Sequence, residues 1–241
     1  MKTATFFLPL FILLVVSTRA NSTPFQQDED GLAKETFRNM TSYRAPDEKA
    51  FTVDDKTANI PHDSSIYLSD KFVINRLKQQ AASLKEYAKA NHFNIDYCFL
   101  VDMSIPSGKK RFFIYNMKKD TVEYSSLVAH GAGSYVPGSD QLAFSNIPGS
   151  YKTSLGRYKI GHAYYGTYGL AYKLYGLDNT NNRAFERAIV LHSLDRVPDS
   201  ETYPNNICES AGCPMVSPAF LRIIGKYITS SSNPILMWIY N

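Results

Sequence analysis

The spacing of apolar residues changes close to residue 91, and this change limits the folds open to the chain. Before that point apolar residues recur every three or four positions: Val73, Leu77, Ala81, Leu84 and Ala88. After it they recur at every second position: Ile95, Tyr97, Phe99, Val101 and Met103. The first spacing predicts an amphipathic helix over about 70–90 with Ser69 as its N-cap, and the second predicts a strand. The chain therefore combines at least one helix with β-structure.

More strands and a second helix are predicted further along. The strands share short runs of alternating or continuous apolar residues: 111–117, 121–128, 188–191 and 235–240. The stretch 130–176 is dense in glycine, serine and tyrosine, which is typical of short strands joined by tight turns. Ser217 followed by Pro218 has the pattern of an N-cap and a first helical turn. The expected fold class is mainly β with flanking helices (α+β), and the run 235–240 should be a strand buried on both faces.

The composition fits an ordinary globular domain. Of 241 residues, 44% are hydrophobic and three are cysteines, which excludes low-complexity disorder and a disulfide-rich scaffold. The segment 21–65 is polar and has no sustained periodicity, so we predict a polar linker or flexible arm. Residues 66–241 then form one domain that begins with the helix at about 70–90.

Residues 1–20 have the pattern of a secretory signal peptide. Lys2 precedes an apolar run, 6–16, that is too short to cross a bilayer, and Thr18 and Ala20 are small residues at the expected cleavage positions. We predict cleavage after Ala20, and an uncleaved amino-terminal anchor is the alternative. No later run approaches transmembrane length, so the expectation is an exported protein without stable membrane insertion.

The charge is mildly basic, with a formal net charge of +4. A cationic exported domain suits an anionic polymer such as a cell wall, and general solubility explains the charge equally well. The chain has no basic run interleaved with aromatic residues, no zinc-finger spacing and no glycine-rich phosphate loop. We therefore expect no nucleic-acid partner, no metal and no cofactor.

Residues with chemical potential concentrate between 189 and 216. A short apolar strand ends in His192, and Ser210-Ala211-Gly212-Cys213 follows just before the second predicted helix. A free thiol is only a few per cent thiolate at neutral pH, so a neighbouring imidazole that takes its proton raises the reactive fraction. A glycine before the cysteine permits a tight turn that aims backbone N–H groups at an oxyanion. The pattern predicts a Cys–His nucleophile pair.

These residues resemble the L,D-transpeptidases of the YkuD type. That family has a His-Gly or His-Ser followed by Ser-His-Gly-Cys, which is matched here by His192-Ser193 and the segment 210–213. Its Thr-Pro-x-Gly-x-Phe/Tyr element resembles 153–158. The segments 144–146 and 182–192 look like the branch called murein L,D-transpeptidase catalytic domain proteins. The resemblance covers about 94–241 and implies a YkuD-like β-sandwich preceded by the amphipathic helix.

The resemblance also implies a reaction, namely acyl transfer in cell-wall peptidoglycan. The Cys213 thiolate would attack the L-centre carbonyl of a tetrapeptide stem, release the terminal D-alanine and leave a thioester for an amine acceptor. His192 would take and return the proton, and the N–H groups of Gly212 and Cys213 would hold the oxyanion. Ser193 and Ser210 would position the imidazole and the loop. The protein would then be periplasmic or cell-wall associated, with stem peptides as its partners.

A second group of residues is expected to contact substrate: Ser145, Asn146, Ser154, Gly156, Tyr158, Tyr165 and Arg187. Two positions depart from the family pattern, because the usual histidine is Ala211 and the usual Arg or Asn after the cysteine is Met215. Arg187 or Arg196 could replace the second of these from elsewhere in the chain.

Several alternatives stay open. Water as the acceptor would make the protein an L,D-carboxypeptidase, and Ala211 and Met215 are compatible with an inactive wall-binding protein on the same fold. Cys98 and Cys208 could form a disulfide, or Cys213 could pair with either of them. His130, which precedes a glycine, could be a loop histidine or a substrate contact. Papain-like enzymes fit less well, because they place the cysteine before the histidine.

Overall fold

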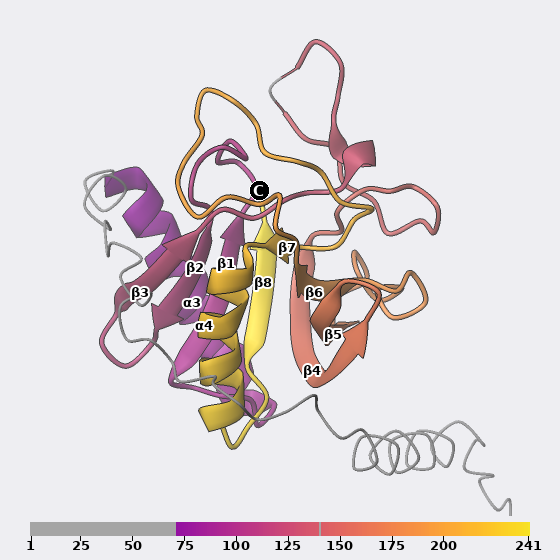
Figure 1. Cartoon of the computed structure of the whole chain (residues 1–241). Coiled ribbons are helices and arrows are strands. Elements are labelled where there is room, and N and C mark those ends of the chain that lie inside the picture. Colours follow the sequence, from indigo (N-terminus) through magenta and orange to yellow (C-terminus); the bar gives the residue numbers. More distant parts are fainter. Residues whose placement is uncertain (1–70, 140) are drawn as a thin grey trace, which may run out of the picture. The chain divides into compact units, whose positions relative to one another are not determined.

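The computed structural model describes residues 71–139 and 141–241, which lie within the second of two units of the chain, residues 56–241 (Figure 1). The predicted signal peptide, the predicted arm and the proposed N-cap Ser69 lie outside the described residues. The elements follow in this order: α3 (Lys71–Ala90), β1 (Tyr97–Asp102), β2 (Phe112–Asn116), β3 (Thr121–Ser126), η2 (Ala132–Ser134), β4 (Gly156–Gly166), β5 (Gly169–Gly176), β6 (Val190–Ser193), β7 (Met215–Val216), α4 (Pro218–Ser230) and β8 (Leu236–Tyr240).

The strands form one sheet of eight in the order β3-β2-β1-β8-β4-β5-β6-β7. The C-terminal strand β8 lies in its middle, parallel to β1 and antiparallel to β4. Trp238 of β8 pairs with Leu100 on one side and Arg157 on the other. The prediction of a C-terminal strand buried on both faces is confirmed, since four of its five residues are buried.

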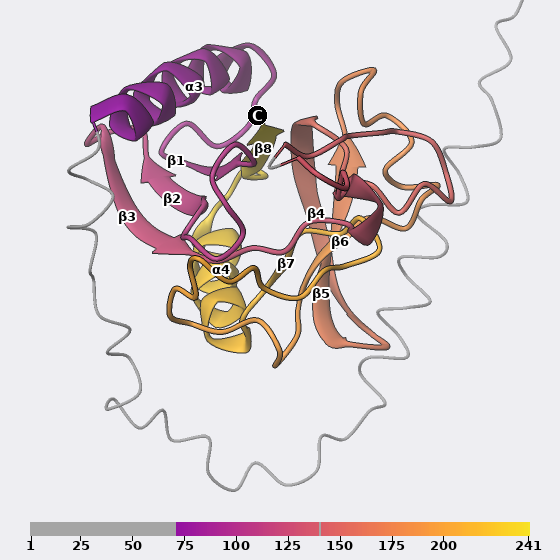
Figure 2. The same ribbon diagram turned by 90° about the horizontal axis from the view of Figure 1, so that it is seen from above.

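The two helices cover opposite faces of the β1–β2 half of the sheet, as seen from above in Figure 2. Alternate residues of β1 divide between two cores, with Leu100 packed in the cluster that contains the α3 residues Leu77 and Leu84. Phe99 lies in the cluster on the α4 side. The predicted amphipathic helix before the strands is thus present. The second predicted helix is α4, whose N-cap Ser217 accepts a hydrogen bond from the backbone N–H of Phe220 at 3.1 Å.

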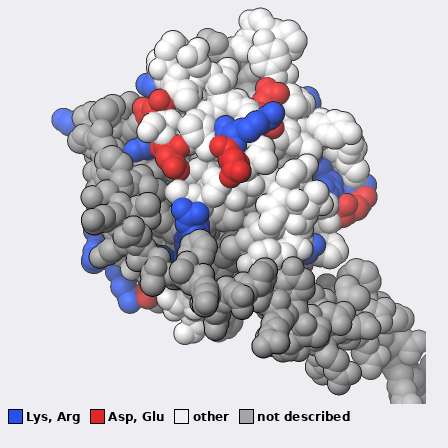
Figure 3. All heavy atoms as spheres, viewed as in Figure 1, with Lys and Arg blue, Asp and Glu red and all other residues white. Residues whose placement is uncertain are grey.

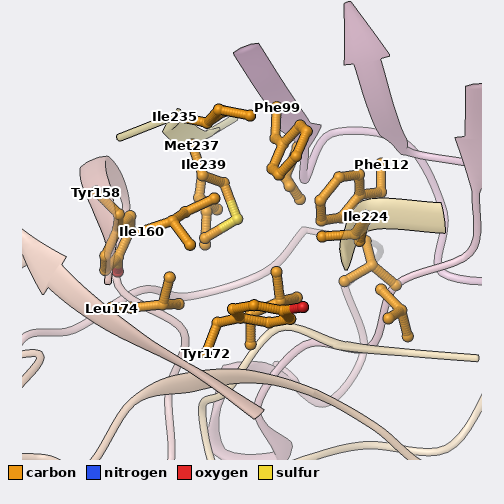
Figure 4. Close-up of a cluster of buried hydrophobic side chains, with 14 of the residues drawn as sticks. Phe99, Phe112, Tyr158, Ile160, Tyr172, Leu174, Ile224, Ile235, Met237 and Ile239 are labelled. Carbon is orange, nitrogen blue, oxygen red and sulfur yellow. The ribbon is translucent and has the colours of Figure 1, made fainter. Parts of the chain in front are cut away.

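The main core lies between the two halves of the curved sheet (Figure 4). Side chains from β4 and β5 face those of β1 and β2 across β8, and Ile224 of α4 closes the cluster. The labelled residues are Phe99, Phe112, Tyr158, Ile160, Tyr172, Leu174, Ile224, Ile235, Met237 and Ile239. The mainly β class with flanking helices is confirmed, and the two layers of the expected sandwich belong to one continuous sheet.

Among the described residues, no helix is long and apolar enough to cross a membrane. Acidic and basic side chains are interspersed on the face shown in Figure 3, without a field of one sign. All three cysteines are free. None of the three alternative disulfides is present: Cys98 lies in the core cluster that contains the α3 residues, and Cys208 packs against a small separate cluster.

Candidate active site

Strands β6 and β7 bring the predicted base and nucleophile together. They are parallel, with His192 opposite Met215, so Cys213 comes to lie beside Val190. The N–H groups of Val190 and His192 point toward the same side of β6, because residues two apart on a strand share that direction. The N–H of His192 donates to the carbonyl of Pro214 at 3.5 Å, and the N–H of Val190 donates to Sγ of Cys213 at 3.4 Å. The sulfur thus continues the ladder in the place of a backbone carbonyl.

A second backbone group holds the thiol proton. Sγ of Cys213 donates to the carbonyl of Ala188 at 3.7 Å. Ala188 has a φ of +53°, and it ends a helical turn in which its N–H donates to Phe185 and the N–H of Ile189 donates to Ala184. This is the hydrogen-bond pattern of a Schellman cap, in which glycine is the usual residue at that position. The reversal aims the Ala188 carbonyl at the sulfur.

The thiol is neutral at rest. Burial raises the pKa of Cys213, while the N–H of Val190 and the positive charge of Arg187 act in the opposite direction. Because burial dominates, the thiol needs a base to become a nucleophile.

The ring of His192 is suited to be that base. Burial lowers the pKa of His192, and the contact with the Ser193 carbonyl partly offsets this effect. Nδ1 lies 3.2 Å from that carbonyl oxygen, which can only accept, so Nδ1 carries the hydrogen and Nε2 is left with a lone pair. The ring of Tyr168 stacks on the imidazole at 5.3 Å between centroids. The backbone carbonyl of Ser193 therefore fixes the orientation of the imidazole.

The loop that ends at the predicted nucleophile, residues 210–213 (the nucleophile loop), is held together by the side chain of Ser210. Its hydroxyl donates to the carbonyl of Cys213 at 2.6 Å and accepts the N–H of Gly212 at 3.1 Å. The expectation that the Gly212 N–H helps to hold the oxyanion is wrong for this geometry, because that N–H is already donated to Ser210. The N–H of Cys213 has no partner among the described residues and remains available. Gly212 is required for another reason: at a φ of +119°, a Cβ would lie 3.0 Å from the carbonyl oxygen of Lys152.

The segment at His130, for which the sequence left a loop histidine or a substrate contact open, supports this loop. The N–H of Ser210 donates to the carbonyl of His130 at 2.9 Å, and the N–H of Ala132 donates to the carbonyl of Ser210 at 2.8 Å. Gly131, between them, lies so close that a Cβ would be 2.8 Å from Cα of Gly212. His130-Gly131 is therefore structural support for the nucleophile loop. Its only sequence signal was an apolar run that ends in His-Gly.

The buried side chain of Arg111 holds the His130-Gly131 segment in place. It is 1% exposed and donates to the carbonyls of Val128, at 3.0 and 2.8 Å, and Ile105, at 3.0 Å. It also lies 2.8 Å from Nδ1 of His130, which must accept because the guanidinium has only donors. Burial, and then the charge of Arg111, lower the pKa of His130 from 6.5 to about 4. At neutral pH His130 is uncharged, so its 3.9 Å approach to Glu209 is not an ion pair.

Comparison with known proteins identifies the family of this chain. Residues 69–240 match the family model described as L,D-transpeptidase catalytic domain. This chain belongs to that family. A search among curated proteins finds no match.

Solved structures give distant likenesses to the family member described here. Bd1075 of Bdellovibrio bacteriovorus is 18% identical with a TM-score of 0.37, and the match covers 62% of this chain and 49% of that one. The helical cell shape determining protein Pgp2 of Campylobacter jejuni is 15% identical with a TM-score of 0.39, over 60% of this chain and 47% of that one. An L,D-transpeptidase from Xylanimonas cellulosilytica is 13% identical with a TM-score of 0.34, over 60% of each chain. The chain spans about half the length of the first two.

Arg187 lies at the site of this L,D-transpeptidase domain, but both of its terminal nitrogens already donate to protein groups. One terminal nitrogen donates to the carbonyl of Ser145 at 2.8 Å and to the hydroxyl of Ser154. The other donates to the carbonyl of Lys152 at 2.6 Å and to the hydroxyl of Ser150 at 3.4 Å. Nε is buried without a partner. The geometry therefore favours a positioning role over direct contact with substrate, because the guanidinium joins 145 and 150–154 to the turn that ends at Ala188.

Two other predicted substrate contacts belong to the interior. Tyr158 is fully buried and donates to the carbonyl of Ser154 at 2.8 Å. Gly156 is buried, and a Cβ there would lie 2.6 Å from Nδ2 of Asn181. Their assignment as substrate contacts is corrected, because neither side chain position can reach a ligand.

The remaining predicted contacts lie at or near the surface. Asn146 donates to Oδ1 of Asn182 at 2.7 Å and to the carbonyl of Asn179 at 3.1 Å, which joins two loops. The carbonyl of Ser145 and the hydroxyl of Ser154 both accept hydrogen bonds from the guanidinium of Arg187. Tyr165 is 79% exposed near the β4–β5 turn.

The two departures from the family pattern have different consequences. Met215 is 3% exposed and packs in a small apolar cluster, so its side chain cannot contact substrate. The backbone carbonyl of Arg196 accepts a hydrogen bond from Sγ of Cys208 at 3.6 Å. Ala211 is exposed on the loop. Within 71–139 and 141–241, no cluster of three or more His, Cys, Asp or Glu residues has a metal-binding arrangement.

Proposed function

We propose that this chain is a peptidoglycan L,D-transpeptidase that uses Cys213 as its nucleophile and His192 as its base. One observation carries the proposal. The sulfur of Cys213 accepts a hydrogen bond from the N–H of Val190, two residues before His192 on β6, and the contact of Nδ1 with the Ser193 carbonyl leaves Nε2 of His192 unprotonated. A signal peptide over residues 1–20 would deliver the enzyme to the periplasm or the cell wall, where stem peptides are its substrates.

In the first half-reaction, Nε2 of His192 takes the thiol proton as sulfur attacks the L-centre carbonyl of diaminopimelate in a tetrapeptide stem. A C–S bond forms, and the carbonyl electron pair moves onto oxygen. The free N–H of Cys213 stabilises that oxyanion. When the intermediate collapses, the C–N bond to D-alanine breaks and His192 returns its proton to the departing amine. A thioester on Cys213 remains.

In the second half-reaction, an amine of another stem attacks the thioester. His192 takes the amine proton and passes it to the departing sulfur, so the thiol is regenerated and an amide crosslink is formed. Water in place of the amine would make a tripeptide, which is the carboxypeptidase alternative. An inactive wall-binding protein would perform neither step.

Acylation by a carbapenem, which mimics the acyl donor, tests the nucleophile. We expect an intact-mass increase of one carbapenem on the folded, reduced protein, no increase for Cys213→Ala, and an unchanged increase for Cys208→Ala. His192→Ala should slow the adduct formation strongly while the fold is kept. An adduct that persists in Cys213→Ala would refute the assignment.

Muropeptide analysis with purified disaccharide tetrapeptide then separates the functions. Dimers joined between two diaminopimelates would establish transpeptidation, and tripeptide monomers would establish carboxypeptidation. Unchanged substrate, together with binding, would establish the inactive alternative.

A further inference from the structure

The outer face of β4, β5 and β6 carries the base together with a set of lysine and aromatic side chains. Residues paired directly across a sheet lie on the same face. Tyr164 pairs with Ala171, which pairs with His192 on β6. Two positions along β5, Lys173 pairs with Val190, the residue whose N–H holds the thiol. This face therefore runs without interruption from β6, which carries His192, across the β4–β5 hairpin.

The lysines and rings on this face contact one another. Nζ of Lys173 lies 4.3 Å from the ring centroid of Tyr164 and 5.8 Å from that of Phe185. Nζ of Lys159 lies 4.6 Å from the ring centroid of Tyr175, and the rings of Tyr175 and Phe185 stack at 5.6 Å and 9°. We call these five residues the lysine–aromatic face.

The positive charge of this face is not balanced by nearby carboxylates. Neither Lys159 nor Lys173 forms an ion pair among the described residues, whereas Asp178 and Glu186 are paired with Arg157 and Arg183. A cation over a ring keeps its charge for an anionic ligand, and the rings give that ligand an apolar surface. An acidic peptide fits both properties.

We propose that the lysine–aromatic face binds the acidic stem peptide of the acyl donor, with Lys173 as the carboxylate-binding residue nearest the nucleophile. This inference rests on the proposed function for its choice of substrate. The distances are suitable, because neighbouring strands lie about 4.8 Å apart, which places Lys173 one strand from Val190. A carboxylate one or two residues from the scissile bond, at about 3.3 Å per residue, would lie within reach of its ammonium group.

Binding to a catalytically blocked enzyme tests the proposal without turnover. On a Cys213→Ala background, the dissociation constant would be measured by calorimetry for two ligands, the acidic tetrapeptide and the same peptide with its carboxylates amidated. Lys173→Met should weaken binding of the acidic peptide about tenfold. This is near the lower end of the effect expected for losing a hydrogen bond to a charged group, because Lys173 is half exposed. The substitution should leave binding of the amidated peptide unchanged. Lys173→Arg should restore binding, and the exposed Lys226→Met on α4 is the matched control.

Two results would overturn the proposal: no effect of Lys173→Met on binding of the acidic peptide, or an equal loss for both peptides. If Lys173→Met weakens acidic-peptide binding but the wild-type protein neither cleaves nor crosslinks muropeptides, the face is established and the transpeptidase function fails.

Discussion

Replacing Ser210 by alanine tests whether the nucleophile loop must be held closed by a side chain. The hydroxyl makes two hydrogen bonds inside the loop, one to the carbonyl of Cys213 and one from the N–H of Gly212. Each is worth about 0.5–1.5 kcal/mol net, so the loss of both is worth about 1–3 kcal/mol. If the loop must adopt this conformation in the transition state, acylation should slow by roughly 5- to 150-fold, since about 1.4 kcal/mol corresponds to a factor of ten.

The opposite outcome has an equally clear physical meaning. Ser210→Ala frees the N–H of Gly212, which could then join the N–H of Cys213 as a second donor to the oxyanion and speed the reaction. The measurement is the second-order rate constant of carbapenem acylation by intact mass, with thermal stability recorded alongside. Ser210→Thr keeps the hydroxyl and should retain most of the rate, and Ser125→Ala on β3 is a control far along the sheet. An unchanged or faster rate for Ser210→Ala would refute the closed-loop argument.

Three further substitutions follow from the structure. Gly131→Ala should lose both stability and acylation, as measured by denaturant unfolding and intact mass, because its Cβ would lie 2.1 Å from the carbonyl oxygen of Tyr151. His130 binds a proton more weakly in the folded state, so stability should be full above pH 6.5 and fall by up to about 3 kcal/mol as the pH drops to about 4; His130→Asn should flatten this dependence. Tyr168→Ala should expose His192 and raise its pKa, moving the acid limb of the pH–rate profile upward, whereas Tyr168→Phe should not.

The sequence allowed the main elements to be predicted because their local patterns are strong. The helix α3 and the strand β1 followed from a change in apolar spacing, and α4 followed from a Ser-Pro start. The burial of a charged residue in β1 was not predicted: Asp102 is fully buried and pairs with Arg76 of α3 at 3.2 Å. A strand whose sequence alternates apolar and charged residues is expected to have one face in solvent. Only the folded structure shows that α3 covers that second face.

The site shows the same division between local and long-range information. His192 and Cys213 could be proposed because each carries its own motif. The hydrogen bonds of Arg111 to the His130 segment and of Arg187 to residues 145–154 could not be predicted, because they join segments that only the folded sheet brings together. The engagement of the Gly212 N–H by Ser210 was missed for a different reason, since it depends on the rotamer of one hydroxyl.

The resting site keeps its two reactive groups uncharged, and this explains the environment around them. Burial favours the thiol over the thiolate at Cys213 and the imidazole over the imidazolium at His192. A preformed ion pair here would have to offset the desolvation of both charges before substrate arrived. The thiol donates its hydrogen to the Ala188 carbonyl and Nε2 carries no hydrogen, so in the proposed reaction charge develops only as sulfur attacks a carbonyl carbon. In that proposed step the negative charge passes to the carbonyl oxygen, and the N–H of Cys213 would stabilise it there, where the reaction creates it.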